Sequence, residues 1–322
     1  MEAVYAASFS SDDPLSGLVV GELAEPEVPD GWTTVEVKAA TLNHHDLWTL
    51  RGVGITEDRL PMILGCDAAG VSADGRDVIV HAVIGNPAAG GGDETLDPKR
   101  SLLSEVYPGT FAARVAVPER NLVAKPSSLT WSEAACLPTA WLTAYRMLTT
   151  RGRLQPGETV LVQGAGGGVA TALIQLGGAL GLRVWTTSRD EEKRQRSLEL
   201  GAEQAFETGA RLPDRVDAVM ETVGEATWSH SLKALRPGGR IVVSGATSGM
   251  NPPADLARVF FLQLSVIGST MGTREELESL ISLLDSTAVR PPIAAEMPMA
   301  QARDAFEALQ AGDVFGKLVL TR

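Results

Sequence analysis

The 322-residue sequence has only two cysteines, Cys66 and Cys136. Two thiols cannot build a four-thiolate zinc site or a disulfide framework, and so few cysteines favour a reducing compartment. A chain of this length needs no such cross-link, because it can bury a complete hydrophobic core. The sequence also lacks an uninterrupted apolar run of about 18 residues, so it predicts no membrane-spanning helix.

Positive charge is scarce as well. Lys and Arg total 28 against 40 Asp and Glu, which gives a formal net charge of −12 at pH 7. No basic run is available to neutralise nucleic-acid phosphates, and an anionic membrane surface would repel this chain. Asp12 and Asp13 interrupt the N-terminal segment, which does not match a secretory signal. We therefore expect a cytoplasmic protein that acts on a small molecule rather than on nucleic acid or a membrane.

Two regions with different patterns follow one another along the chain. The first is rich in turn residues and in alternating Val and Thr, and it predicts strands at residues 1–6, 33–40, 77–82 and 112–117. Residues 86–108 show no period and predict a surface loop. Residues 130–150 carry apolar side chains at helical spacing and predict a helix.

From residue 158 onward, strands and helices alternate. The expected strands are 158–163, 183–188, 217–223, 240–246 and 264–270. Helices are expected at 168–180 and 190–200, and later at 274–285 and 300–311 before a last strand. This alternation predicts an α/β fold class with a doubly wound parallel sheet.

A glycine-rich turn, Gly164–Ala170, follows the first strand of this region and opens a helix. Glycines let the backbone approach a pyrophosphate closely, and the helix N-terminus offers unpaired amides and a partial positive charge. A tight strand–helix turn without a ligand would use similar residues. The strand–turn–helix–strand context favours a dinucleotide site.

The end of the second strand indicates which dinucleotide binds. An NAD site places a carboxylate there for the ribose 2′-hydroxyl, whereas this chain has Thr187, Ser188 and Arg189, with Lys193 one turn later. Asp190 lies beyond the strand end. A 2′-phosphate pairs with a hydroxyl and with cations, so we predict NADPH rather than NADH as the cofactor.

Five motifs, in this order along the chain, resemble the medium-chain dehydrogenase/reductase superfamily, and most closely its zinc-independent quinone oxidoreductase-like branch. The segments Leu42–Leu47 and Leu64–Gly70 match its N-x-x-D and G-x-D-x-x-G patterns. Leu137–Tyr145 resembles the helix that enters the cofactor domain. Gly164–Ala170 resembles the family's glycine-rich pattern as A-x-G-x-x-A, through Ala165, Gly167 and Ala170, and Gly316–Leu320 resembles the usual C-terminus.

The resemblance implies a domain organisation and an assembly. A GroES-like β-rich catalytic domain is expected over residues 1–123, a Rossmann NADP-binding domain with a doubly wound parallel sheet is inserted at 124–271, and residues 272–322 complete the catalytic domain. Members of the family are usually dimers or tetramers. We expect a homodimer or homotetramer that uses the sheet edge at 264–270.

The resemblance also implies that the zinc ligands are lost. Asn43, Cys66 and Thr139 stand where zinc-dependent relatives have a Cys, a His and a second Cys or acid, and residues 86–108 contain no cysteine for a structural zinc. Asn and Thr are poor zinc ligands. We therefore predict no metal. An irregular metal site remains an alternative, built from His44, His45, Asp46, Cys66 and Asp67.

Without a Lewis acid, hydride delivery to an activated acceptor needs only hydrogen-bond donors and a proton source. The predicted catalytic residues are Asn43, His44, Asp46 and Thr143, and His45 is a further possible proton relay. The predicted cofactor-binding residues are Thr143, Ala165, Gly166, Gly167, Gly168, Val169, Ser188, Arg189, Lys193, Val223, Ala246, Thr247 and Lys317.

Together these features predict a metal-free, NADPH-dependent oxidoreductase that transfers hydride to a quinone or an α,β-unsaturated carbonyl compound. Two alternatives stay open. One is a zinc-type alcohol dehydrogenase-like enzyme with irregular ligands. The other is a nucleotide-binding relative with little turnover.

Overall fold

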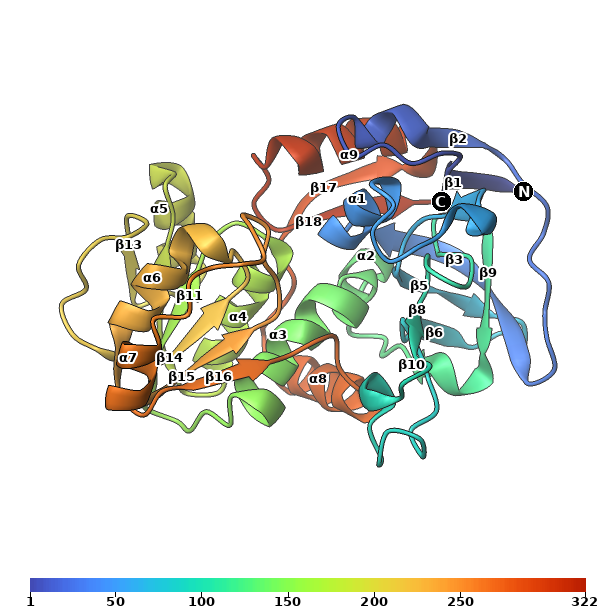
Figure 1. Cartoon of the computed structure of the whole chain (residues 1–322). Helices are drawn as coiled ribbons and strands as arrows, with labels where there is room; N and C mark the ends of the chain where they lie inside the picture. The colour runs from blue at the N-terminus through green and yellow to red at the C-terminus, as the bar shows by residue number, and fades with distance from the viewer. The chain divides into compact units, whose positions relative to one another are not determined.

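The structure, a computed structural model, describes residues 1–322 and divides into two compact units (Figure 1). Unit 1 comprises Met1–Leu142 and Met271–Arg322, and unit 2 comprises Thr143–Thr270. Unit 2 is therefore an insertion between two segments of unit 1. Residues 124–142, expected in the cofactor domain, are grouped with unit 1.

Unit 1 is built mainly of antiparallel strands in three sheets. The largest has the order β10-β6-β5-β3-β18-β17, with β9 also paired to β3. Its strands are β3 (Trp32–Thr41), β5 (Asp67–Ser72), β6 (Asp77–Val80), β9 (Arg114–Pro118), β10 (Leu122–Ala124), β17 (Ile293–Pro298) and β18 (Lys317–Thr321). The smaller sheets are β2-β1-β4 and β7-β8, with β1 (Glu2–Ala6), β2 (Leu18–Glu22), β4 (Met62–Ile63), β7 (Val83–Ile84) and β8 (Ser101–Leu102).

The C-terminal segment completes the sheet that the N-terminal segment begins. Strand β18 pairs antiparallel with β3, placing Val319 opposite Thr41. The helices of unit 1 are α1 (His44–Leu50), α2 (Trp131–Ala135), α8 (Arg274–Ser286) and α9 (Ala302–Ala311). Phe306 of α9 and Phe111 are both fully buried, with edge-to-face rings 6.1 Å apart, so residues from both segments share one core.

The helix predicted over residues 130–150 is present but irregular. Thr130 caps α2 by accepting a hydrogen bond from the Glu133 amide. The chain then forms π-helical turns at Leu137–Trp141 and Met147–Arg151, on either side of α3 (Leu142–Arg146). Pro138 lacks an amide hydrogen, which interrupts the regular helical hydrogen bonds of the first turn.

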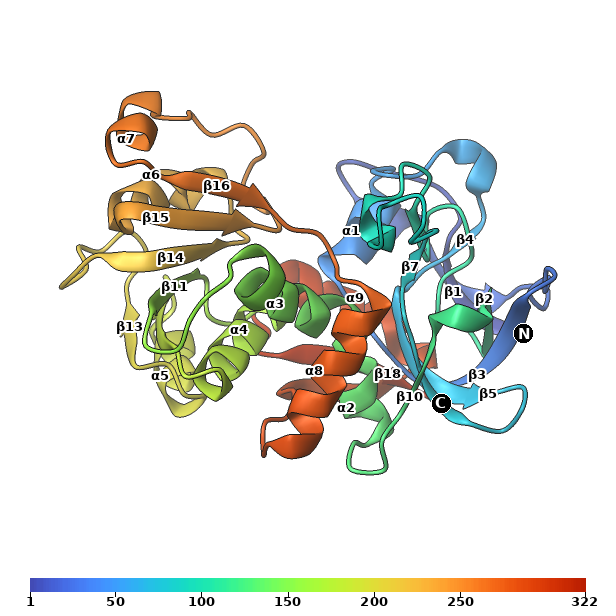
Figure 2. The same cartoon turned by 90° about the horizontal axis from the view of Figure 1, so that it is seen from below.

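Unit 2 contains a six-stranded, all-parallel sheet in the order β13-β12-β11-β14-β15-β16, and Figure 2 shows β14, β15 and β16 side by side. Its strands are β11 (Thr159–Gln163), β12 (Arg183–Thr187), β13 (Gln204–Phe206), β14 (Val216–Glu221), β15 (Leu235–Val243) and β16 (Ser265–Gly268). Its remaining helices are α4 (Gly168–Ala179), α5 (Glu191–Glu199), α6 (Glu225–Ala234) and α7 (Leu256–Phe261). The predicted fold class, a Rossmann-type parallel sheet with a GroES-like β domain, is confirmed.

Helix α4 packs closely against the central strands. All five residues of β11 are buried, as expected for a strand covered on both faces. Gly177 of α4 faces β12, where an added Cβ would lie 2.6 Å from a methyl group of Val184. The missing side chain therefore lets the helix approach the sheet. No helix of the structure is long and apolar enough to cross a membrane.

Candidate active site

The glycine-rich turn of unit 2 fits the phosphates of a dinucleotide. Gly164 has a φ of +90°, a conformation that favours glycine. Gly167 is the N-cap of α4, and no side chain caps the helix. An added Cβ at Gly167 would meet nothing within 4 Å, so the space before the helix is open. Because the first helical bond runs from Thr171 to Gly167, the preceding amides are left for an anionic ligand.

A buried hydrogen-bond network begins at Gln163, the residue directly before this turn. Gln163 accepts a 2.6 Å bond from the Thr187 hydroxyl and donates a 2.9 Å bond to Ser231. Ser231 donates in turn to the buried carboxylate of Glu221, at 2.6 Å. Sequence reasoning missed this network, because its members are scattered over β11, β12, α6 and β14.

Glu221 shapes the next turn of the site. Its carboxylate accepts bonds of 2.9 Å and 3.0 Å from the amides of Val223 and Gly224. The predicted cofactor residues Ala246 and Thr247 lie in the turn after β15, where the Thr247 amide bonds to the Thr222 carbonyl. Since β14 and β15 are parallel, both turns lie at the edge of the sheet that also carries the glycine-rich turn.

The end of β12 is followed by the cation Arg189 and by Asp190, whose carboxylate caps the next helix. Arg189 is exposed, whereas Asp190 caps α5 by accepting a bond from the Lys193 amide. Arg194, which sequence reasoning missed, donates bonds of 2.8 Å and 3.2 Å to the carbonyls of Ser188 and Arg189. A guanidinium thus holds the strand end where a 2′-phosphate is predicted to bind.

In unit 1, three polar side chains surround Asp67. This fully buried carboxylate accepts bonds of 2.6 Å from Thr41 and 2.8 Å from the amide nitrogen of Asn43. The Lys317 ammonium lies 3.4 Å from Asp67 and donates bonds to the Asn43 amide oxygen and the Leu42 carbonyl. Asn43 is therefore held on both ends of its amide group.

Asp46 is placed by backbone contacts within the same region. Its carboxylate oxygens accept a 2.8 Å hydrogen bond from the backbone N–H of Asn43 and a 3.0 Å hydrogen bond from the backbone N–H of Gly65. Complete burial, opposed in part by these bonds, raises the pKa of Asp46 to about 7. The carboxyl group therefore orders the start of α1.

The two adjacent histidines of α1 have different surroundings. His44 is exposed, whereas Nε2 of His45 is buried without a hydrogen-bond partner. Burial lowers the pKa of the His45 imidazole, while Glu105 and a hydrogen bond with the Leu103 backbone raise it in part. The Thr139 hydroxyl of unit 1 is likewise buried and unpaired.

Three residues of the alternative, irregular metal site, Asp46, Cys66 and Asp67, are hydrogen-bonded to other groups. The Cys66 thiol donates to the Leu103 carbonyl, and burial raises its pKa well above the usual range, so it resists becoming a thiolate ligand. No group of three or more His, Cys, Asp or Glu is arranged to hold a metal ion.

The structure brings Asn43, Asp46 and Lys317 together in unit 1. Lys317, predicted to bind the cofactor, donates a hydrogen bond to Asn43 and lies 3.4 Å from Asp67 within this unit. Thr143 is a buried residue at the start of unit 2, and this unit holds every predicted cofactor residue except Lys317. The catalytic and binding roles of all these residues stay predictions.

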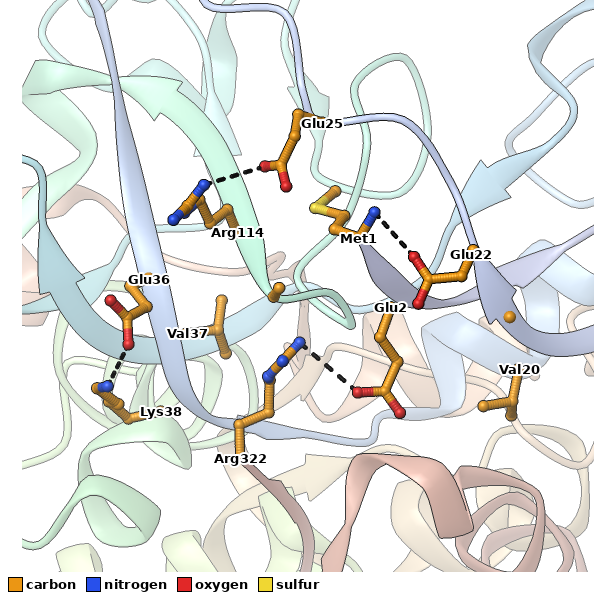
Figure 3. Close-up of a pocket in the computed structure, with 12 residues that line it drawn as sticks. Met1, Glu2, Val20, Glu22, Glu25, Glu36, Val37, Lys38, Arg114 and Arg322 are labelled. Atoms are coloured by element: carbon orange, nitrogen blue, oxygen red, sulfur yellow. Dashed lines mark hydrogen bonds and ion pairs between the residues drawn. The ribbon is translucent and has the colours of Figure 1, made fainter.

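Unit 1 contains a hollow of about 870 Å³ (Figure 3). Its rim carries four ion pairs, formed by the N-terminal amine with Glu22, Lys38 with Glu36, Arg114 with Glu25, and Arg322 with Glu2. No predicted site residue lines it. Each cation already has a carboxylate partner, so the hollow offers no unpaired charge to a ligand.

Known proteins resemble the chain over nearly its whole length. Human quinone oxidoreductase is 27% identical over 342 residues, which cover 99% of this chain and 97% of the relative. Acryloyl-coenzyme A reductase of Metallosphaera sedula is 28% identical over 323 residues, which cover 95% of this chain and 96% of the relative. Among solved structures, that of an NAD-dependent alcohol dehydrogenase superposes on this chain with a TM-score of 0.91. The two sequences are 32% identical, and the match covers 100% of both chains.

Two protein-family models match this chain. The alcohol dehydrogenase GroES-like domain matches residues 29–127, and the zinc-binding dehydrogenase domain matches residues 168–286. Both the fold and the order of the domains agree with these matches. The chain therefore belongs to the medium-chain dehydrogenase/reductase superfamily of nicotinamide-dependent oxidoreductases.

Proposed function

We propose that this protein is an NADPH-dependent oxidoreductase that reduces a quinone or an α,β-unsaturated carbonyl compound without a metal ion. Hydrogen-bonding groups, rather than metal ligands, at the Asn43 region carry the proposal. Asn43 is fixed between Asp67 and Lys317, and Cys66 is a buried thiol bonded to a carbonyl. The names of the quinone oxidoreductase and acryloyl-coenzyme A reductase relatives support this substrate class.

The cofactor choice rests on the end of β12. When bound, NADPH supplies the hydride. Ser188, Arg189 and Lys193 would hold its 2′-phosphate, and the open N-terminus of α4 would hold its pyrophosphate. Asp190 is committed to capping α5 and does not replace the carboxylate of an NAD site.

A proton must accompany the hydride, and His45 is better placed than His44 to relay it. The His45 ring is bonded to the Leu103 backbone, which leaves Nε2 unpaired and buried. An unpaired buried nitrogen is costly unless a ligand or proton uses it. Because the pKa of His45 is lowered, its protonated form becomes available as pH falls, and we expect reduction to be faster below neutral pH.

The test follows NADPH oxidation at 340 nm with a panel of quinones and enones, with and without a chelator. We expect turnover that the chelator leaves intact, and no stoichiometric zinc by elemental analysis. His45→Gln should lower kcat on the order of a hundredfold, whereas His44→Gln, its matched neighbour, should change kcat little. Tight NADPH binding without turnover would instead support a nucleotide-binding relative. Loss of zinc and activity together would support the alcohol dehydrogenase-like alternative.

A further inference from the structure

Unit 2 contains a second hollow, of about 500 Å³, that no predicted site residue lines. Its lining includes Arg151, Arg153, Arg240, Glu158 and Ile267. Glu158 immediately precedes β11, whereas the glycine-rich turn follows the other end of this five-residue strand. A strand of this length spans roughly 15 Å, so the hollow is separate from the expected dinucleotide site.

Two of the three arginines are anchored by backbone carbonyls. Nε of Arg151 donates a 2.7 Å bond to the Gly268 carbonyl, and Nε of Arg240 donates a 2.5 Å bond to the Gly152 carbonyl. A guanidinium has five N–H donors, so the anchor leaves Arg151 with donors for another partner, whereas Nη2 of Arg240 is already bonded to Glu158. These side chains are preorganised, which lowers the entropic cost of binding a planar or tetrahedral oxyanion.

Arg153 has no partner of its own. Its guanidinium is exposed and forms no hydrogen bond or ion pair in the structure, yet its backbone has a φ of +50°. This left-handed conformation is unfavourable for a residue that carries a side chain. Strained residues gather at functional sites, and here the strain places a third cation beside the hollow.

The charge of the lining favours an anion. Three guanidinium groups face one carboxylate, although the whole chain carries a net charge of −12. Glu158 is already engaged, since it bonds to Arg240 at 2.6 Å and lies 3.9 Å from Arg236. The remaining excess of two positive charges matches a phosphate group at neutral pH.

We propose that this hollow binds a small phosphate-bearing anion, either free phosphate or a phosphomonoester. Guanidinium groups recognise phosphate oxygens through paired, charge-assisted hydrogen bonds, and three arginines at one hollow provide that chemistry. Its volume also has room for a group larger than phosphate itself. The site is independent of the proposed reductase activity.

The test is isothermal titration of the full-length protein with inorganic phosphate and with glycerol 3-phosphate, at constant ionic strength set with chloride. We expect saturable binding of at least one probe, and the tighter probe identifies the source of the phosphate group. Arg153→Gln removes no contact of the folded protein, so it should fold normally and weaken binding about tenfold. Arg211→Gln, at an exposed arginine of the same unit, is the matched control and should bind as the wild type does.

Binding that falls in Arg153→Gln and stays unchanged in both Arg211→Gln and Arg189→Ala supports the site. Arg189→Ala reports on the opposite end of the sheet, where the dinucleotide phosphate is proposed to bind. No binding above the chloride reference overturns the proposal. Equal binding by Arg153→Gln and wild type, or loss of binding in Arg189→Ala alone, overturns it as well.

Discussion

The ammonium of Lys317 lies 2.7 Å from the amide oxygen of Asn43, although the two residues are 274 positions apart in the chain. Strand β18 carries Lys317 into the sheet of the N-terminal segment, next to the residue that precedes α1. The same ammonium lies 3.4 Å from the buried Asp67 carboxylate. One cation therefore both orients the Asn43 amide and compensates a buried charge.

Removing this cation should destabilise the fold. We expect Lys317→Met to lower the free energy of unfolding by about 3 kcal/mol, because it leaves the Asp67 charge buried without its cation. The double variant Lys317→Met/Asp67→Asn should recover part of that loss. Lys38→Met breaks an exposed pair with Glu36 and should cost less than about 1 kcal/mol. Urea denaturation measures all four proteins, and equal effects of the two lysine variants would contradict the assignment.

Arg189 should determine the choice of cofactor. Arg189→Ala is expected to weaken NADPH binding about tenfold to a hundredfold, because it removes charge-assisted bonds to the 2′-phosphate at an exposed site. NADH lacks that phosphate, so its dissociation constant should hardly change. Arg196→Ala, on helix α5 that follows Arg189, is the control. Fluorescence quenching measures both constants. Equal wild-type affinity for the two cofactors, or equal losses in Arg189→Ala, would show that the strand end is misassigned.

Asp46 should make stability depend on pH. Its pKa is raised to about 7 in the folded state from a reference value of 3.8, so its stabilising contribution is complete below pH 3.8. That contribution is lost as pH rises through 7. Relative to Asp46→Asn, which does not titrate, wild type should lose up to about 4 kcal/mol of unfolding free energy between pH 4 and pH 7. Chemical denaturation at several pH values tests this, with Asp12→Asn as the exposed control. Parallel pH profiles for wild type and Asp46→Asn would be the contrary result.

Glu94 should make stability depend on pH in the opposite direction to Asp46. Burial raises the pKa of this carboxyl, but hydrogen bonds from His81 and from the Arg274 amide outweigh it and lower the pKa to about 2. Its stabilising contribution is therefore present above pH 4.5 and is lost as pH falls toward 2. At pH 7, Glu94→Gln should lower the free energy of unfolding by about 3 kcal/mol. Thermal and urea unfolding can compare it with Glu57→Gln at the surface. A loss no larger than that of Glu57→Gln would rule out the stabilising role.

The outer edge of β16 should pair with a second copy. Figure 2 shows helix α7 and strand β16. Helix α7 has no buried residue, and the two elements together expose Leu256, Phe260, Phe261 and Val266. An open strand edge beside an apolar patch is a site of association. Light scattering at micromolar concentration should give the mass of a homodimer or homotetramer. Phe260→Asp/Phe261→Asp should reduce the mass, whereas Val28→Asp, at an exposed residue of unit 1, should not. A monomeric wild type would refute the prediction.

Local patterns determined the α/β region well. The strands around 159–163, 183–187 and 240–243 were predicted because buried parallel strands are continuous apolar runs, which a sequence displays directly. The glycine-rich turn was predicted for a similar reason, since strand, glycines and helix are adjacent in the chain. The short strand β13, Gln204–Phe206, was missed because three half-buried residues carry too little pattern.

The sequence by itself therefore determined the fold class, the glycine-rich turn and the cationic end of β12, because each depends on residues close together in the chain. Only the tertiary structure decided which side chains meet Asn43. Asp67 is 24 positions away and Lys317 is 274, and their encounter depends on how β5 and β18 pair with β3. It likewise decided that the Nε2 of His45 is buried and unpaired while His44 is exposed, because burial depends on packing that no local pattern encodes.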